Sequence, residues 1–302
     1  MKEYNILDEK KKLAQFITPI PLREFIKKEA GVCNVVFDCS VGSGQLIYEL
    51  EASRKVGTDI DENAVIVAVQ NGIDAIVCDY ITSDFDCLYD TAISNYPFSL
   101  KATSEQAECL EKDGFFKMFL NKQGKFTGVL DFVFILKSFL KAQRGFYLCF
   151  PGIAYRGAEK KYREYLVKNK YVEKIALITN AGFEDTKIPI LYLKLSKKEN
   201  TEVLISEIDI VENSITEKTV SYSEIIKNDY NFSTSCYIEK KIEKEKIDIL
   251  LVESETTKNF ESFVKNSLEL DYFLLTNNML SRDTFFDKIK ILEKYLEKYK
   301  NS

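Results

Sequence analysis

The sequence predicts a doubly wound α/β fold with a mostly parallel sheet. Short β-rich runs alternate with helical patterns through the first two thirds of the chain, and this alternation is typical of βαβ units whose sheet is covered on both faces. A glycine turn follows the first run directly. The 302 residues, 45% of them apolar, are enough for one large core or two unequal domains.

Seven β-rich runs are predicted as strands. Val, Ile, Phe and Tyr dominate them, as expected for strands buried on both faces. The runs cover residues 32–38, 55–59, 75–78, 88–94, 145–150, 172–179 and 188–195. The first run, VCNVVFD, and the second run each end in an aspartate, and an aspartate directly follows the third run.

Four segments between these strands carry helical patterns. They cover residues 45–53, 62–71, 127–142 and 160–169. Asp61 is predicted as the N-cap of the second helix, because an aspartate side chain in that position accepts from the free N–H groups of the first turn.

A charged break, SKKEN at residues 196–200, follows the last predicted strand. It divides the chain into a catalytic domain, residues 1–198, and a C-terminal extension, residues 199–302. The extension begins with a small β segment at 201–220 and ends in a helix at 285–299. One apolar face of that helix carries Phe285, Ile289, Leu292, Leu296 and Tyr299. The stripe packs either on the protein's own core or against a partner helix.

Composition excludes several classes of protein. The chain has no histidine, which removes Ser-His-Asp hydrolysis and histidine-ligated metal sites, and no metal is expected. Its seven cysteines form no CxxC pair, which argues against zinc ribbons and disulfide scaffolds. A formal charge of −5 is inconsistent with a polybasic coat. With neither a signal-peptide pattern nor a membrane-spanning run, a cytoplasmic protein is expected.

The segment FDCSVGSGQL, residues 37–46, is the most informative one. A predicted strand ends in Asp38, the turn contains Gly42 and Gly44, and a helical pattern follows. Such a turn lets the backbone approach a nucleotide-like ligand at the carboxyl end of the strand. It lacks both the third glycine of the dinucleotide fingerprint and the lysine of a P-loop, and taken alone it favours an ordinary turn.

Two further acids extend this pattern. Asp59 ends the second strand, where it can accept hydrogen bonds from both hydroxyls of a ribose. Asp79 follows the third strand and can accept from an adenine amino group. An adenosine ligand without phosphates fits these three acids, which predicts S-adenosyl-L-methionine as the cofactor. The alternative is that the acids are helix caps and turn formers.

The fourth strand is followed by Asn95, Tyr96, Pro97 and Phe98. The Asn95 side-chain oxygen and the Tyr96 carbonyl can accept the two hydrogens of an exocyclic amine, while Phe98 stacks on the ring. Held in this way, the amine nitrogen can point its lone pair at a sulfonium methyl group, which is catalysis by orientation. A simple Asn-x-Pro turn is the structural alternative.

These motifs, in this order, resemble the modification (M) subunits of type I restriction-modification systems, within the adenine-N6 DNA methyltransferases. Residues 14–19, AQFITP, are similar to the family's QF-x-TP segment, which implies that Gln15, Phe16 and Thr18 hold the methionine end of the cofactor. Asn95–Phe98 are similar to its catalytic NPP(F/Y) motif. Three later segments also match family blocks: 150–157 (FPGIAYRG), 183–189 (FEDTKIP) and 230–237 (YNFSTSCY). The resemblance runs from about residue 13 to residue 237.

Three departures from the family pattern matter. Tyr96 stands where the family has a proline. The tyrosine keeps the backbone carbonyl but lacks the rigidity of proline, and this leaves three outcomes for activity open: intact, slowed or absent. The cofactor loop reads DCSVGSG instead of D-P-A-C-G-S-G. The long N-terminal helical domain of full M subunits is expected to be missing.

DNA and a separate specificity subunit are the implied partners, and the 285–299 helix is the predicted docking element. Eight cations in or beside the loops after Asn95 are candidates for phosphate contacts: Lys101, Lys122, Lys125, Arg144, Arg156, Lys160, Lys161 and Arg163. Two other functions remain open. One is methyl transfer to RNA or to a protein amide, and the other is a catalytically degenerate subunit that binds only the cofactor or a partner.

Overall fold

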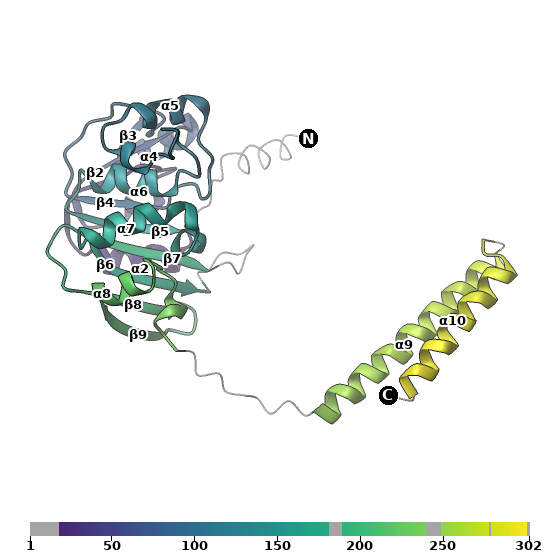
Figure 1. Ribbon diagram of the computed structural model, residues 1–302. Coiled ribbons are helices and arrows are strands. Elements are labelled where there is room, and N and C mark those ends of the chain that lie inside the picture. Colours follow the sequence, from purple (N-terminus) through teal and green to yellow (C-terminus); the bar gives the residue numbers. More distant parts are fainter. Residues whose placement is uncertain (1–17, 181–188, 240–248, 278, 301–302) are drawn as a thin grey trace. The chain divides into compact units, whose positions relative to one another are not determined.

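The computed structural model describes residues 18–180, 189–239, 249–277 and 279–300 (Figure 1). The chain divides into two compact units, residues 1–240 and residues 241–302. No helix among the described residues is long and apolar enough to cross a membrane.

In the described part of the first unit, nine strands form one sheet in the order β3-β2-β1-β4-β5-β7-β6-β8-β9. The strands β1 to β5 run parallel to one another, whereas β7 lies antiparallel between β5 and β6. Their bounds are β1 Cys33–Asp38, β2 Ala52–Asp59, β3 Asp74–Val77, β4 Thr91–Ser94, β5 Arg144–Cys149, β6 Val172–Thr179, β7 Ile190–Ser196, β8 Glu202–Asp209 and β9 Ser214–Ser221. The predicted mostly parallel α/β sheet is confirmed.

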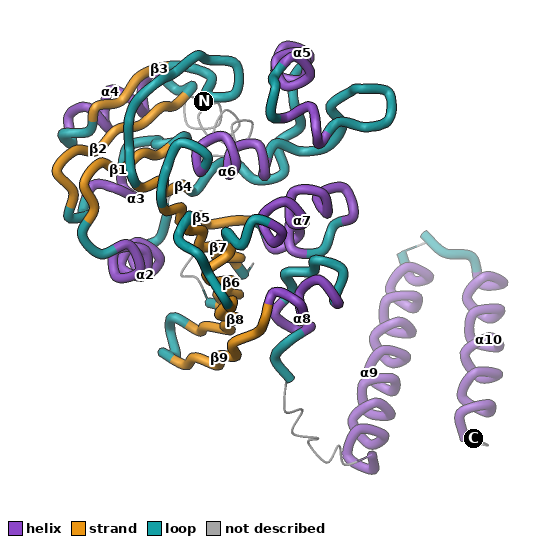
Figure 2. The backbone as a smooth tube through the Cα atoms, turned by 60° about the vertical axis from the view of Figure 1, so that its left-hand side comes forward, coloured by secondary structure: helices purple, strands orange, loops and turns teal. Residues whose placement is uncertain are grey.

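Helices cover both faces of this sheet. One face packs against α2 (Ile20–Ala30), α3 (Gln45–Tyr48) and α4 (Glu62–Gln70), and the other against α6 (Asp131–Phe139), α7 (Lys160–Lys168) and α8 (Tyr222–Lys227). Figure 2 shows α2 on one side of the sheet and α7 and α8 on the other. The remaining short elements are α5 (Ser104–Lys112) and the 3-10 turns η1 (Phe116–Phe119), η2 (Pro151–Ala154), η3 (Gly157–Glu159) and η4 (Thr234–Cys236).

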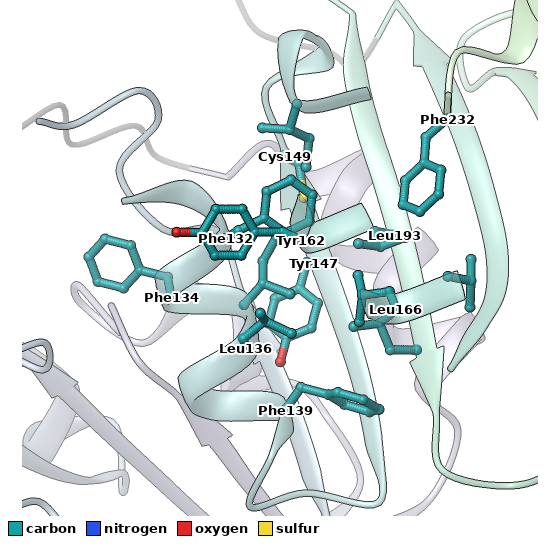
Figure 3. Packing of buried hydrophobic residues seen from close by; sticks show 14 of the residues in the cluster. Phe132, Phe134, Leu136, Phe139, Tyr147, Cys149, Tyr162, Leu166, Leu193 and Phe232 are labelled. Atoms are coloured by element: carbon teal, nitrogen blue, oxygen red, sulfur yellow. The ribbon is translucent and has the colours of Figure 1, made fainter. Parts of the chain in front are cut away.

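The two layers form two hydrophobic cores because side chains alternate along each strand. In β1, Val36 packs into the core below α2, while Phe37 packs into the core below α6. Phe146 and Tyr147 divide in the same way in β5. The aromatic-rich core below α6 and α7 includes Tyr147 and Cys149 of β5 (Figure 3). This packing on both sides fixes the carboxyl ends of β1, β4 and β5.

Some element boundaries differ from the prediction. The helix predicted at 45–53 ends at Tyr48, because β2 begins at Ala52 rather than at residue 55. The helix predicted at 127–142 begins only at Asp131, since Val129 forms a β-bridge with Lys101. Asp61 caps α4 as predicted, accepting from the N–H groups of Asn63 and Ala64.

The β segment predicted at 201–220 is a hairpin that extends the main sheet. β8 pairs in parallel with β6, and β9 pairs antiparallel with β8. Because these pairings are continuous with the sheet, the first compact unit runs to residue 240, past the boundary expected after residue 198.

The second unit contains two helices, α9 (Ile249–Thr276) and α10 (Arg282–Lys300). α10 includes the helix predicted at 285–299, whereas α9 was not predicted. The two helices contact each other, with Val264 and Asp271 of α9 buried and Lys288 of α10 paired with Asp271 at 2.6 Å. Of the predicted apolar face, Phe285, Ile289 and Leu292 are half-buried, and the side chains of Leu296 and Tyr299 lie outside the described part.

Candidate active site

The carboxyl ends of the parallel strands β1, β2 and β4 bring the candidate residues to one edge of the sheet. Asp38 is the last residue of β1, Asp59 is the last residue of β2, and Asn95 directly follows β4. Ligands of open α/β sheets bind at this edge.

The two glycines of the turn after β1 have different structural roles. Both have a positive φ, +52° at Gly42 and +84° at Gly44, which disfavours any residue with a Cβ atom. A Cβ on Gly44 would lie 2.1 Å from Ile73 Cδ1, so this glycine permits close packing beneath the turn. A Cβ on Gly42 would meet no atom within 4 Å, so the backbone at Gly42 borders open space.

Asp59 holds the glycine turn in place. Its Oδ2 accepts from the N–H of Gly42 at 2.7 Å, and its Oδ1 accepts from the N–H of Asp61 at 3.0 Å. Burial raises the pKa of the Asp59 carboxyl, while these two hydrogen bonds oppose the shift. A carboxylate has about four lone-pair sites, so hydrogen-bonding capacity remains for ligand hydroxyls.

Asp38 is fully buried and links β1 to β4. Its Oδ1 accepts from the Ser94 hydroxyl at 2.6 Å and from the Ser40 N–H at 3.0 Å. Burial raises the pKa of Asp38 to about 7, although both hydrogen bonds lower it. Ser94 was not identified from the sequence, where its only signal is its position directly before Asn95.

Asp79 connects the loop after β3 to α5. Its Oδ1 accepts from the Ile81 N–H at 2.9 Å, and its Oδ2 accepts from Gln106 Nε2 at 2.8 Å. Gln106 also accepts from the Thr103 N–H, completing the capping box of α5. Gln106 was not identified from the sequence, although the Thr-x-x-Gln pattern is a recognisable helix start.

The Asn95 side chain is oriented by Thr18. Asn95 Nδ2 donates to the Thr18 hydroxyl at 3.0 Å, which leaves Oδ1 as the remaining acceptor of the amide. Thr18 is buried, so the contact is shielded from water. Gln15 and Phe16, the other two residues expected near the methionine end of the cofactor, lie outside the described residues, as do residues 183–188 of the later family block.

The Tyr96 side chain points into the protein core. It is 1% exposed and stacks on Phe134 with ring centroids 5.5 Å apart. The Phe98 ring meets Tyr96 edge-on at 5.9 Å and is half-buried. The tyrosine therefore anchors the segment from Asn95 to Phe98 by packing, at the position where the family motif has the first of its two prolines.

Two of the cations expected to contact DNA phosphates bind backbone carbonyls of the protein instead. Arg144 begins β5, at the sheet edge opposite Asn95, and donates to the Ala30 carbonyl at 3.0 Å. Arg163 is 2% exposed and donates to the backbone carbonyls of Ile153 and Tyr230. The expectation for these two is therefore wrong, because both are used to join backbone segments.

The other six cations lie near the loops that follow β4 and β5. Lys125 is paired with Glu111, Lys160 with Asp229, and Lys161 donates to the Leu120 carbonyl. Lys101 and Lys122 are exposed and have no ion-pair partner among the residues that the structure describes. Arg156 contacts the loop after β4 directly, as described below.

Comparisons with known proteins agree with this geometry. The family model for N-6 DNA methylases matches residues 79–218, a range that includes Asn95 to Phe98. This match makes residues 79–218 similar to the N-6 DNA methylase family.

Several solved structures share the fold. A type I restriction-modification methyltransferase subunit from Streptococcus thermophilus matches with a TM-score of 0.61 at 17% identity, over 75% of this chain and 61% of that one. A putative class I S-adenosylmethionine-dependent methyltransferase from Listeria monocytogenes matches with a TM-score of 0.56 at 15% identity, over 73% and 72%. A chain from a type I restriction-modification complex matches with a TM-score of 0.59 at 11% identity, over 89% and 67%.

At these identities the matches show the fold alone, a mostly parallel α/β sheet similar to that of a putative class I S-adenosylmethionine-dependent methyltransferase. The chain spans 61% of the length of the Streptococcus subunit.

Proposed function

We propose that this protein is an S-adenosylmethionine-dependent adenine-N6 DNA methyltransferase that serves as the modification subunit of a restriction-modification system. The observation that carries the proposal is the placement of Asn95 at the carboxyl end of β4, with its amide nitrogen bound to Thr18 and its oxygen left to accept. This arrangement lies within the range that matches the N-6 DNA methylase family.

The residues at the sheet edge fit the cofactor. Open space beside Gly42 admits a ligand close to the backbone, and Asp59 lies next to that glycine to accept from ribose hydroxyls. Asp38 and Asp79 supply further carboxylates, and no basic side chain in this turn calls for a phosphate. When bound, S-adenosylmethionine supplies an electrophilic methyl group.

The chain's own contribution to the reaction is orientation. The Asn95 Oδ1 and the Tyr96 carbonyl accept the two amine hydrogens of a flipped adenine, which directs the nitrogen lone pair toward the cofactor site. Phe98 stacks on the base. The acceptors hold the amine without a histidine, and the excess proton leaves to water.

The first test is Asn95→Ala. We expect loss of methyl transfer to DNA with an unchanged dissociation constant for the cofactor, because Asn95 contacts the amine and not the adenosine. Asn169→Ala is the matched control, since Asn169 is an exposed asparagine whose amide bonds only to the carbonyl of Tyr165 in its own helix. Methylation is measured as tritium transfer and binding by calorimetry. Equal loss of both would mean that the segment is misassigned.

The substrate is tested by offering DNA, RNA and protein in parallel to the wild-type chain. Transfer to DNA alone supports the proposal, whereas transfer to RNA or protein would replace it. Tyr96 favours one further candidate, a subunit that binds the cofactor without turnover. Saturable binding that is abolished by Asp59→Ala, combined with no transfer to any substrate, would establish that candidate instead.

We assign catalysis to residues 1–198 and docking to the helix that ends the C-terminal extension, residues 199–302. Exposed Lys101 and Lys122 are the candidates for DNA phosphate contacts, and a separate specificity subunit reads the sequence. Apolar side chains on both C-terminal helices, among them Phe263 at 65% and Phe286 at 56% exposure, support a partner surface there. Deletion of residues 284–302 should abolish co-purification with the specificity subunit and retain cofactor binding, and intact assembly would refute this docking site.

A further inference from the structure

Ser99, directly after the proposed catalytic segment, has an unusual backbone conformation. Its φ is +55°, in the left-handed region that residues with a Cβ atom avoid. Such a conformation persists only where surrounding contacts hold it.

Two side chains from distant parts of the chain hold Ser99. Asp131 Oδ2, at the start of α6, accepts from the Ser99 N–H at 3.0 Å. Arg156 Nη2, from the loop after β5, donates to the Ser99 hydroxyl at 3.0 Å. The next residue is held as well, because the Leu100 carbonyl accepts from the Leu130 N–H at 2.8 Å.

The loop after β5 is built to direct Arg156 toward Ser99. The guanidinium lies over the Phe150 ring at 5.1 Å, and its Nη1 pairs with Glu159 at 3.2 Å. A Cβ on Gly152 would lie 2.5 Å from both Nε and Nη2 of Arg156, so only glycine at position 152 leaves room for this guanidinium. The family-like segment at 150–157 thus has a physical explanation: aromatic ring, glycine and arginine together create one contact to the loop after β4.

We propose that Arg156 and Asp131 are positioning residues for methyl transfer. By holding Ser99, they set the direction of the Tyr96 carbonyl and the plane of the Phe98 ring, without touching the target base themselves. This inference rests on the proposed function, whose catalytic segment they hold.

The local charges are consistent with this role. Asp131 is fully buried, and burial raises its pKa to about 6, while its hydrogen bond from Ser99 and the charge of Arg156 lower it. The negative charge of Glu159, which is also buried, raises the pKa of Asp131 and so opposes the effect of Arg156. Arg156 therefore lowers the pKa of both neighbouring carboxyls, and Arg163 acts in the same direction on Glu159.

A DNA phosphate is the competing partner for Arg156. The two roles predict different kinetics, since a positioning residue affects kcat while a phosphate contact affects KM for DNA and the salt dependence of binding. They also differ in their dependence on Ser99, because only the positioning role acts through the serine hydroxyl.

The experiment compares Arg156→Ala, Ser99→Ala and the double variant with wild type. We expect kcat to fall about 100-fold in Arg156→Ala, with KM for DNA and the cofactor dissociation constant within about three-fold. Ser99→Ala should lower kcat in the same direction, and the double variant should be no worse than Arg156→Ala, because the two residues act as one unit. Lys168→Ala is the control, an exposed cation on α7 that pairs with Glu164 in its own helix.

Amide hydrogen exchange supplies a readout that needs no activity. Exchange of the peptide covering residues 96–101 should become about 10- to 100-fold faster in Arg156→Ala and in Asp131→Ala, and should be unchanged in Lys168→Ala. Unchanged exchange in both test variants would overturn the proposal, as would a raised KM for DNA with a normal kcat. If wild type transfers no methyl group, the proposed function fails, and the exchange result still decides whether the two residues hold the loop.

Discussion

Tyr96 stands where the family has proline, and the structure predicts that restoring proline damages the protein. The tyrosine ring is 1% exposed and packs between Phe98 and Phe134. Removing a buried aromatic ring costs about 3–5 kcal/mol. Proline retains part of the volume of the tyrosine, which offsets part of this cost.

The net loss in free energy of unfolding for Tyr96→Pro is therefore about 2–3 kcal/mol. In a unit of this size it corresponds to a decrease in Tm of about 4–12 °C. Thermal unfolding measures the shift, and tritium transfer to DNA should be no higher than in wild type, since Phe98 loses the ring against which it packs. A Tm at or above the wild-type value, together with faster methylation, would refute this reasoning and favour a degenerate catalytic segment.

Two tyrosine-to-phenylalanine variants serve as controls for this estimate. Tyr96→Phe removes only the hydroxyl, whose side-chain partner is the Cys149 thiol, a weak hydrogen-bonding group, and should change the free energy of unfolding by less than about 1 kcal/mol. Tyr89 is also buried, but its hydroxyl donates to the Ser138 carbonyl at 2.9 Å, so Tyr89→Phe should lower the same quantity by about 1 kcal/mol. A smaller change in Tyr96→Phe than in Tyr96→Pro separates the effect of the ring from that of the hydroxyl.

Three further predictions concern the first unit. Gly44→Ala should lower Tm more than Gly42→Ala, because only at Gly44 would the new Cβ lie 2.1 Å from another atom. Gly42→Ala should instead raise the dissociation constant of the cofactor, measured by calorimetry. Equal losses of Tm in the two variants would contradict this distinction. Asp38 has a pKa of about 7 in the folded protein, above its ordinary 3.8, so the folded state binds the proton more tightly and wild-type stability falls as pH rises from about 4 to about 7. Asp38→Asn lacks this fall, so its Tm relative to wild type should increase between pH 5 and pH 8, and parallel Tm profiles would count against the buried carboxyl.

Much of the fold was predictable because its signals are local. The alternation of β-rich runs with helical patterns is written in consecutive residues, and Asp61 caps α4 as its position predicts. Boundaries were predicted less well where a long-range pairing determines them. The helix after the glycine turn is short because β2 starts early, and residues 202–221 join the sheet because β8 pairs with β6.

The residues placed at the sheet edge were predictable because strand ends can be read along the chain. Asp38, Asp59 and Asn95 each end or follow a predicted strand, and parallel strands bring their carboxyl ends together. The hydrogen-bond partners were not predictable in this way. Ser94 lies 56 residues from Asp38, and Arg156 lies 57 residues from Ser99.

The sequence by itself determined the order of elements, the glycine turn and the acids and amide at the strand ends, because each depends on residues close together in the chain. Only the tertiary structure decided what those residues contact. The Tyr96 ring lies in the core, the Thr18 hydroxyl accepts a hydrogen bond from Asn95, and Arg144 lies at the opposite edge of the sheet from Asn95. Such contacts depend on how two layers of helices pack on one sheet, and packing between distant segments leaves no periodic trace in the sequence.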